Sequence, residues 1–229
     1  MNDQNQKRMQ RSESFLVGAL LAVAGGFLDA YTYLCRGEVF ANAQTGNMVL
    51  LAHWLTERQW RRAGMYLIPI LSFFAGVLVA EVLKTRFSGR AGRFHWRHTV
   101  LAVEIAVLTA ASFLPQGKLD GVVNVMVSFV CALQVETFRK VRGNPFASTM
   151  CTGNLRSGTD ALYHGLFRHD RIQLRRSALY FGIIACFICG AALGGVLSEW
   201  APQRAVLLAA GLQLVAFFLM YEARNPALD

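Results

Sequence analysis

The chain has 229 residues, of which 54% are hydrophobic and only 16% are charged, and its formal net charge is +9. Few soluble domains of this size are so apolar, so we expect lipid to contact most of the molecular surface. The basic residues lie between apolar runs and form no binding face, which argues against a nucleic-acid-binding protein.

Apolar runs divide the chain into candidate transmembrane helices. Five are long enough to cross a hydrocarbon core of about 30 Å at about 1.5 Å per residue, and a sixth, at residues 99–114, is shorter. The first is too long for the apolar part of a signal peptide, so we expect it to remain as a helix. The five long runs are residues 15–34, 63–83, 119–138, 177–197 and 204–221.

A polar motif occurs twice among these runs. Residues 36–47 and residues 142–154 both contain Arg-Gly, then Phe-Ala, then Thr-Gly-Asn. The likeness continues into the following apolar run, where Gly76 matches Gly190. Because motifs that recur in the same order indicate an internal repeat, we expect the chain to consist of two homologous halves.

The predicted organisation follows from this repeat. A cytoplasmic tail at residues 1–13 precedes a first repeat at residues 14–114. A connector at residues 115–118 leads to a second repeat at residues 119–221, and residues 222–229 form a C-terminal tail.

The topology depends on two short stretches, residues 48–55 and residues 155–167. If both cross the membrane there are eight crossings, and the lysines and arginines divide almost evenly between the two sides. If both are re-entrant there are six crossings, and most of these residues fall on the cytoplasmic side, although Arg58, Arg61 and Arg62 stay outside. The positive-inside rule favours the second arrangement.

We therefore predict an all-α membrane protein with six transmembrane helices and two re-entrant half-helices, and with both termini in the cytoplasm. Three crossings in each half make the two halves point in opposite directions. The arrangement is that of two inverted three-helix repeats.

The duplicated motif is the first candidate site. Glycine permits a close backbone approach, and Thr or Asn is expected to supply the N-cap oxygen of each half-helix. Free amides at a half-helix start favour an anion or a polar group near the membrane centre. The alternative is that these side chains only satisfy backbone groups at the helix breaks. The predicted substrate-binding residues are Thr45, Gly46, Asn47, Thr152, Gly153 and Asn154.

Asp29 is the residue of the first helix that is most costly to insert, at roughly 2.5 to 3.5 kcal/mol if central. It shares a helical stripe with Gly25, so we expect it to face protein rather than lipid. Its counterpart in the second half is Val135. It is a candidate for proton or cation coupling, with Glu104 as a second candidate; alternatively, its carboxylate accepts hydrogen bonds from neighbouring amides.

Other polar residues are candidates to line a pore or site. A local or interhelical hydrogen bond is their alternative use. They are Gln44, Asn124, Ser128 and Gln134.

Small residues recur at equivalent positions of the two halves. Gly76 and Ala80 correspond to Gly190 and Gly194. We expect them to pack the two symmetry-related helices together at the centre, with a homodimer face as the alternative.

The sequence Gly-Phe-Leu-Asp-Ala at residues 26–30, together with the two Thr-Gly-Asn motifs, resembles the signature of the YoaK family of bacterial multi-pass membrane proteins, whose function is unknown. The resemblance covers nearly the whole chain and implies a bacterial inner-membrane protein of about six helices. The family typically has Gln-Asn-Ala before its second motif. Here Gln134 is kept, whereas Val135 and Glu136 replace the other two residues.

These features favour a membrane transporter or channel for a small polar or anionic solute, with Asp29 as the candidate for proton coupling. The alternative is a non-transporting structural or regulatory membrane protein that binds a partner. An enzyme is not expected, because the chain lacks HExxH, GxSxG and paired catalytic aspartates. The expected partners are the lipid bilayer and the solute, with a second copy of the chain as a further candidate and with no nucleic acid, cofactor or metal.

Overall fold

The computed structural model describes residues 14–87, 96–141, 144–146 and 149–222, and these residues form eight helices and one short β ladder. The helices are α1 (Phe15–Cys35), α2 (Gln44–Thr56), α3 (Trp60–Phe87), α4 (Trp96–Ala111), α5 (Asp120–Thr137), α6 (Cys151–Phe167), α7 (Arg171–Trp200) and α8 (Val206–Glu222).

The predicted helical class is confirmed, with one local addition. Strand β1 (Lys140–Val141) pairs antiparallel with β2 (Asn144–Pro145) between α5 and α6, where only irregular chain was expected. Residues 142–143 and 147–148 of the second polar motif lie outside the described residues.

Four helices, α1, α3, α5 and α7, are long and apolar enough to cross a membrane by length and composition. Helix α8 carries a shorter apolar stretch, Val206–Met220. The exposed side chains of α3 and α7 are mostly apolar, so these helices present a surface suited to lipid. The chain is therefore a membrane protein with several spanning helices.

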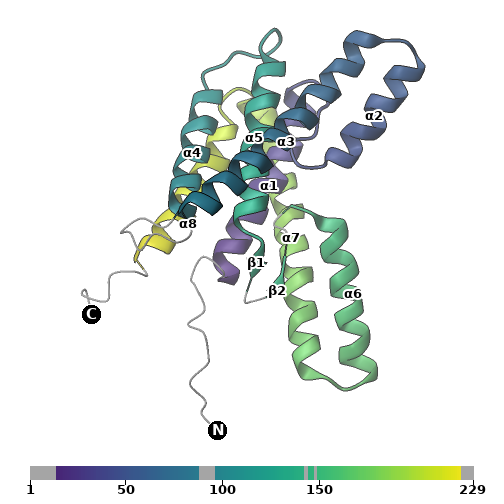
Figure 1. Cartoon of the computed structure of the whole chain (residues 1–229), viewed down its shortest axis with the longest axis vertical. Helices are drawn as coiled ribbons and strands as arrows, with labels where there is room; N and C mark the ends of the chain where they lie inside the picture. Colours follow the sequence, from purple (N-terminus) through teal and green to yellow (C-terminus); the bar gives the residue numbers. More distant parts are fainter. Residues whose placement is uncertain (1–13, 88–95, 142–143, 147–148, 223–229) are drawn as a thin grey trace.

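Helix ends gather at two opposite ends of the bundle (Figure 1). At one end, Val17 and Leu21 of α1 pack with Ala216 and Met220 of α8. At the other end, Gln116 donates from Nε2 to the carbonyl oxygen of Cys35, at 3.2 Å. The first and last described helices thus begin and end on the same side.

The core forms where helices from the two halves of the sequence meet. Helix α1 packs along α7, and α3 packs along α5, while α4 and α8 contact each other and lie against α5 and α1 (Figure 1). The largest buried cluster includes Phe27 and Tyr31 of α1, Val127 of α5 and Ala209 of α8.

Glycines allow α1 and α7 to approach at backbone distance. A Cβ at Gly26 would collide with the carbonyl oxygen of Phe187, and a Cβ at Gly190 would collide with that of Val23. The same holds for α3 and α5, where Gly76 lies against the backbone of Phe129.

The expectation that the small residues join α3 to α7 was therefore wrong. Gly76 packs on Ala132 and Phe129 of α5, and Gly194 packs on Phe27 of α1. The physical reason is the same in both cases, because a small residue permits close packing against whichever helix crosses it.

The two short helices are attached differently from the rest. Helix α2 packs mainly against α3, and α6 packs mainly against α7, where Ser177 donates from Oγ to the carbonyl oxygen of Gly158 at 2.9 Å. Figure 1 shows the α2–α3 and α6–α7 hairpins diverging on the side of the molecule away from α4 and α8. The arrangement leaves α2 and α6 at the edge.

We expect Gly26→Ala and Gly190→Ala to destabilise the protein by at least about 1 kcal/mol, because each added methyl group forces two backbones apart. Gly211→Ala is the matched control, since nothing lies within 4 Å of a Cβ at that helical position. It should be neutral or stabilising by up to about 1 kcal/mol. Thermal unfolding of the purified protein in one detergent measures the difference, and equal effects at all three positions would contradict the close α1–α7 contact.

Candidate functional site

The chain between α1 and α2, residues 36–43, is held by a carboxylate. The backbone N–H of Asn42 donates to Oδ1 of Asp29 at 2.6 Å, and the amides of Ala41 and Ala43 also donate towards this group. The residue is only 7% exposed. The expectation that Asp29 faces protein is confirmed. Its carboxylate accepts hydrogen bonds from the backbone amides that precede α2.

Asn47 fixes the same loop from the opposite side. Its Oδ1 accepts from the Phe40 N–H at 3.0 Å, and its Nδ2 donates to the Phe40 carbonyl at 2.7 Å and to Gln44 Oε1 at 2.9 Å. Gln44 in turn donates to the carbonyl of Ala41 at 2.8 Å. The amide side chain of Asn47 is fully buried and is used by the loop.

The predicted N-cap role of the motif was wrong. Ala43 occupies the N-cap position of α2, and Met150 that of α6, and neither makes a side-chain capping bond. Asn47 and Asn154 are the fourth helical residues, so the side chain of Asn47 reaches back over the helix start instead.

The remaining residues of the first motif have different surroundings. Thr45 is exposed, whereas Gly46 lies under the ring of Phe40, and a Cβ there would come to 3.0 Å from Cδ2 of that ring. Phe40 itself stacks on Tyr33 with ring centroids 4.7 Å apart. Gly46 is thus needed for packing the loop.

The second motif repeats part of this pattern. Asn154 is buried, and Thr152 and Gly153 are exposed, with nothing within 4 Å of a Cβ at Gly153. The position matched to Asp29 is Val135, which cannot accept a hydrogen bond. The two helix starts therefore differ in charge.

The two interrupted segments come together at Gly25 of α1. Asn42 donates from Nδ2 to the Gly25 carbonyl at 3.2 Å, and a Cβ at Gly25 would collide with the side chain of Thr149. We name Gly25, Asp29, Asn42 and Thr149 the central junction.

The structure places Glu104 and Gln134 in a separate buried network. Gln213 donates from Nε2 to Glu104 Oε2 at 2.8 Å and to Gln134 Oε1 at 3.2 Å. Gln134 donates from Nε2 to the carbonyl of Leu21 at 3.1 Å. Sequence reasoning missed Gln213, although an amide inside the apolar run at residues 204–221 was a signal for it.

Helix α5 supplies two further predicted residues. Asn124 donates from Nδ2 to the carbonyl oxygen of Arg36 at 2.6 Å. Ser128 is buried one turn further along, and its Oγ makes no hydrogen bond within the described part of the chain. For Asn124 the structure shows an interhelical bond, one of the two uses expected of it.

Arg36 is another buried residue whose role the sequence analysis did not identify. Its side chain is fully buried and donates from Nε to the Tyr31 hydroxyl at 2.8 Å and from Nη1 to Asp120 Oδ1 at 2.9 Å. It also reaches the carbonyls of Leu114 and Pro115. One guanidinium thus joins the end of α1 to the α4–α5 connection.

Comparison with known proteins gives the family. The family model described as a protein of unknown function, DUF1275, matches residues 17–219. The chain belongs to DUF1275. The match extends from the first turn of α1 to the last turns of α8, so the family covers both polar motifs and every described helix.

A curated relative supports the same membership. The chain is 26% identical over 181 residues to the UPF0700 transmembrane protein YoaK of Bacillus subtilis strain 168, covering 76% of this chain and 79% of the relative. The resemblance to the YoaK family is therefore confirmed. No solved structure matches this DUF1275 member.

We expect Asn47→Ala to lower the unfolding free energy by about 1–3 kcal/mol, because it removes the fully buried amide that pairs both the N–H and the carbonyl of Phe40. Thr45→Ala, two residues away on the exposed side, should change it by less than about 0.5 kcal/mol. Thermal unfolding in detergent measures both. Equal losses would show that the loop does not depend on the Asn47 amide.

We expect Arg36→Lys to destabilise the protein more than Asp120→Asn, because an ammonium cannot replace the forked guanidinium that reaches a hydroxyl, a carboxylate and two carbonyls. Breaking such a buried pair from the arginine side costs about 3–5 kcal/mol. Expression yield and thermal unfolding report the loss. A tolerated Arg36→Lys would contradict this role of the guanidinium.

Proposed function

We propose that this protein is a membrane transporter or channel for a small polar or anionic solute, and that the solute passes the central junction between the starts of α2 and α6. The observation that carries the proposal is the meeting of two interrupted segments at Gly25, beside the buried carboxylate of Asp29. Interrupted chain at membrane depth persists where it is buried in protein or lines a cavity, and transporters place substrate sites at such breaks.

The proposed topology has six crossings, with α2 and α6 re-entrant from opposite faces and both termini in the cytoplasm. It is supported by the grouping of helix ends, because Cys35 lies beside the α4–α5 connection while Val17 lies beside Met220. The reciprocal pairing of α1 with α7 and α3 with α5 is the pattern expected of an inverted repeat. The inner membrane is the proposed location.

An anionic or strongly polar solute is favoured by the difference between the two helix starts. The start of α2 already has the Asp29 carboxylate beside its amides. The start of α6 has Val135 at the matched position and exposes Thr152 and Gly153. The positive end of the α6 dipole therefore remains available to a solute.

Asp29 is the proposed coupling residue, because it is an intramembrane carboxylate that is hydrogen-bonded to the chain just before α2. Glu104 is the second candidate, since its Oε2 is bonded by the neutral amide of Gln213. The Glu104 network reaches α1 at Leu21, about two turns from Asp29 along that helix. The protein is proposed to act without enzymatic chemistry.

The second candidate function is a structural or regulatory membrane protein that binds a partner. Its specific support is that Asp29 and Asn47 are both already used by backbone groups of the loop. In that case the polar motifs would only stabilise the fold and would bind no solute. Substitutions at Thr45 and Thr152, whose side chains are exposed, distinguish the two functions.

A thermal-shift screen of the purified protein against sulfate, phosphate, acetate and polar metabolites tests the site. We expect a stabilising ligand whose effect is lost in the Thr45→Val/Thr152→Val variant, while the unliganded melting temperature stays unchanged. The Thr56→Val variant, at the far end of α2, is the control. If every ligand acts equally on wild type and the double variant, the motif is not the site.

Flux of the identified ligand into liposomes then tests coupling. We expect Asp29→Asn to abolish the dependence of flux on a proton gradient, because an asparagine side chain, unlike a carboxylate, does not bind and release a proton in the physiological pH range. A gradient dependence that survives in Asp29→Asn would exclude Asp29 as the coupling residue.

Cysteine labelling in intact cells tests the topology. We expect Arg58→Cys and Arg204→Cys to react with a membrane-impermeant reagent from the same side, and Arg168→Cys to react from the opposite side. A full crossing by α2 and α6 would place residues 58 and 204 on different sides, so labelling of those two from opposite sides would refute the re-entrant arrangement.

A further inference from the structure

Helix α6 exposes one stripe of unusual composition. Its buried positions are Asn154, Gly158, Ala161 and Gly165, of which Gly158 lies against Tyr180 of α7 and Gly165 against Leu174 of α7. The exposed positions recur three or four residues apart on the opposite face, as one side of a helix does. This α6 stripe consists of Thr152, Leu155, Arg156, Thr159, Asp160, Tyr163, Leu166 and Phe167.

The α6 stripe is too polar to suit contact with lipid acyl chains. Each turn of the stripe carries a hydroxyl or a charge from Thr152 to Asp160, and the Asp160 side chain is 74% exposed. The outward faces of α3 and α7 differ, since they present large apolar residues such as Phe74 and Leu193. A surface meant for acyl chains has that second composition.

The α6 stripe is also too apolar to suit exposure to water. Leu155, Tyr163, Leu166 and Phe167 are between 51% and 72% exposed. Clustered aromatic and aliphatic side chains interleaved with an arginine are typical of protein interfaces. The composition fits a protein surface better than it fits either solvent.

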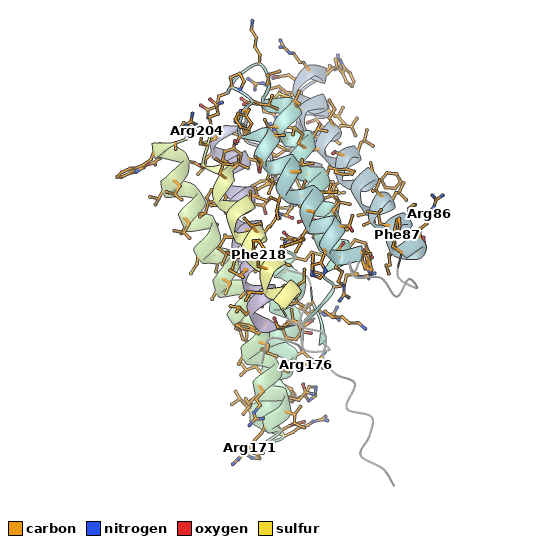
Figure 2. All side chains as sticks on the ribbon, turned by 90° about the vertical axis from the view of Figure 1, so that its left-hand side faces the viewer. Arg86, Phe87, Arg171, Arg176, Arg204 and Phe218 are labelled. Atoms are coloured by element: carbon orange, nitrogen blue, oxygen red, sulfur yellow. The ribbon has the colours of Figure 1, made fainter. Side chains whose placement is uncertain are left out.

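The position of α6 leaves this stripe open to a partner. The helix packs mainly on α7, and Figure 1 shows it at the outer edge of the molecule, away from α4 and α8. Figure 2 views the molecule from the left-hand side of Figure 1, so α4 and α8 face the viewer and α6 belongs to the far side. The described helices therefore do not cover the stripe.

We infer that the α6 stripe pairs with the same stripe of a second copy, forming a parallel homodimer. Copies inserted by the same route share one orientation, so two α6 helices run parallel about a twofold axis along the membrane normal. Thr152, Thr159 and Leu166 recur every seven residues, which is the spacing of a parallel helix pair. The small residues Thr152 and Gly153 permit close approach.

Charge favours a second copy over a different partner. The α6 stripe carries one arginine, Arg156, and one aspartate, Asp160, four residues apart. In the dimer, Arg156 of one copy pairs with Asp160 of the partner subunit, and the twofold axis generates the pair twice. The stripe is thus complementary to itself, as an isologous interface requires.

The dimer places the starts of both α6 helices at the interface. Thr152 and Gly153 then lie next to a second chain. The dimer does not depend on the identity or existence of a solute, because it rests on the α6 stripe alone.

Photo-crosslinking in native membranes tests the inference. A benzoyl-phenylalanine replaces Tyr163 or Phe167 in α6, and Phe74 of α3 or Phe218 of α8 serves as the control, because both control rings are exposed. We expect a product of twice the chain mass from the two α6 positions, and mass spectrometry should identify both peptides as this chain. A product from Phe74 or Phe218 at equal yield, or a crosslink from α6 to lipid or to another protein, would overturn the inference.

A charge exchange tests the pairing itself. In liposomes, single-molecule photobleaching should count two copies in wild type and mostly one in Arg156→Asp and in Asp160→Arg. The Arg156→Asp/Asp160→Arg double variant should restore two copies, which a folding defect could not do. Arg171→Asp, outside the stripe, should stay dimeric. Single wild-type copies, or failure of the double variant to recover, would refute the proposed interface.

Discussion

The bond between the Asp29 carboxylate and the backbone amides before α2 is the interaction on which the centre of the structure depends. A helix that starts inside a bundle leaves amides unpaired, and at membrane depth no water replaces the lost partners. Asp29 supplies acceptors from α1, and Asn47 binds the other groups of the loop. With those groups paired, the loop lies against Gly25 and α2 can run outward along α3.

The second half of the chain pairs the backbone groups before its short helix in a different way. Val135 stands at the position matched to Asp29, and the chain before α6 instead forms the β1–β2 ladder. Phe146 donates its N–H to the carbonyl of Arg139 at 2.8 Å, which extends this backbone pairing. Strand hydrogen bonds satisfy backbone without adding charge, whereas a carboxylate adds a negative charge. The two loops are therefore alike in sequence and different in electrostatics.

Much of the helical framework could be predicted from the sequence, because long apolar runs determine where membrane helices lie. The burial of Asp29 followed from its stripe with Gly25. The site was harder, because an asparagine expected at a helix start is the fourth helical residue and bonds back to Phe40. Arg36 was visible only as half of an Arg-Gly pair, since its partners Asp120 and Leu114 are about 80 residues away. The small residues correctly indicated close helix packing. They did not indicate which helix each one packs against, because that depends on how the helices cross in the fold.

The close backbone contacts at Gly26 and at Gly190 have a mechanical consequence. It joins α1, from the first half of the chain, to α7, from the second half, and Gly76 joins α3 to α5 in the same way. Each half-helix is carried by one member of these pairs, α6 by α7 and α2 by α3. The two closely packed bodies among these helices are thus α1 with α6 and α7, and α3 with α2 and α5. Each body combines segments from both halves of the sequence, so a displacement between the bodies would have to break the Asn42 bonds to Asp29 and Gly25, while each half-helix could stay on the helix that supports it.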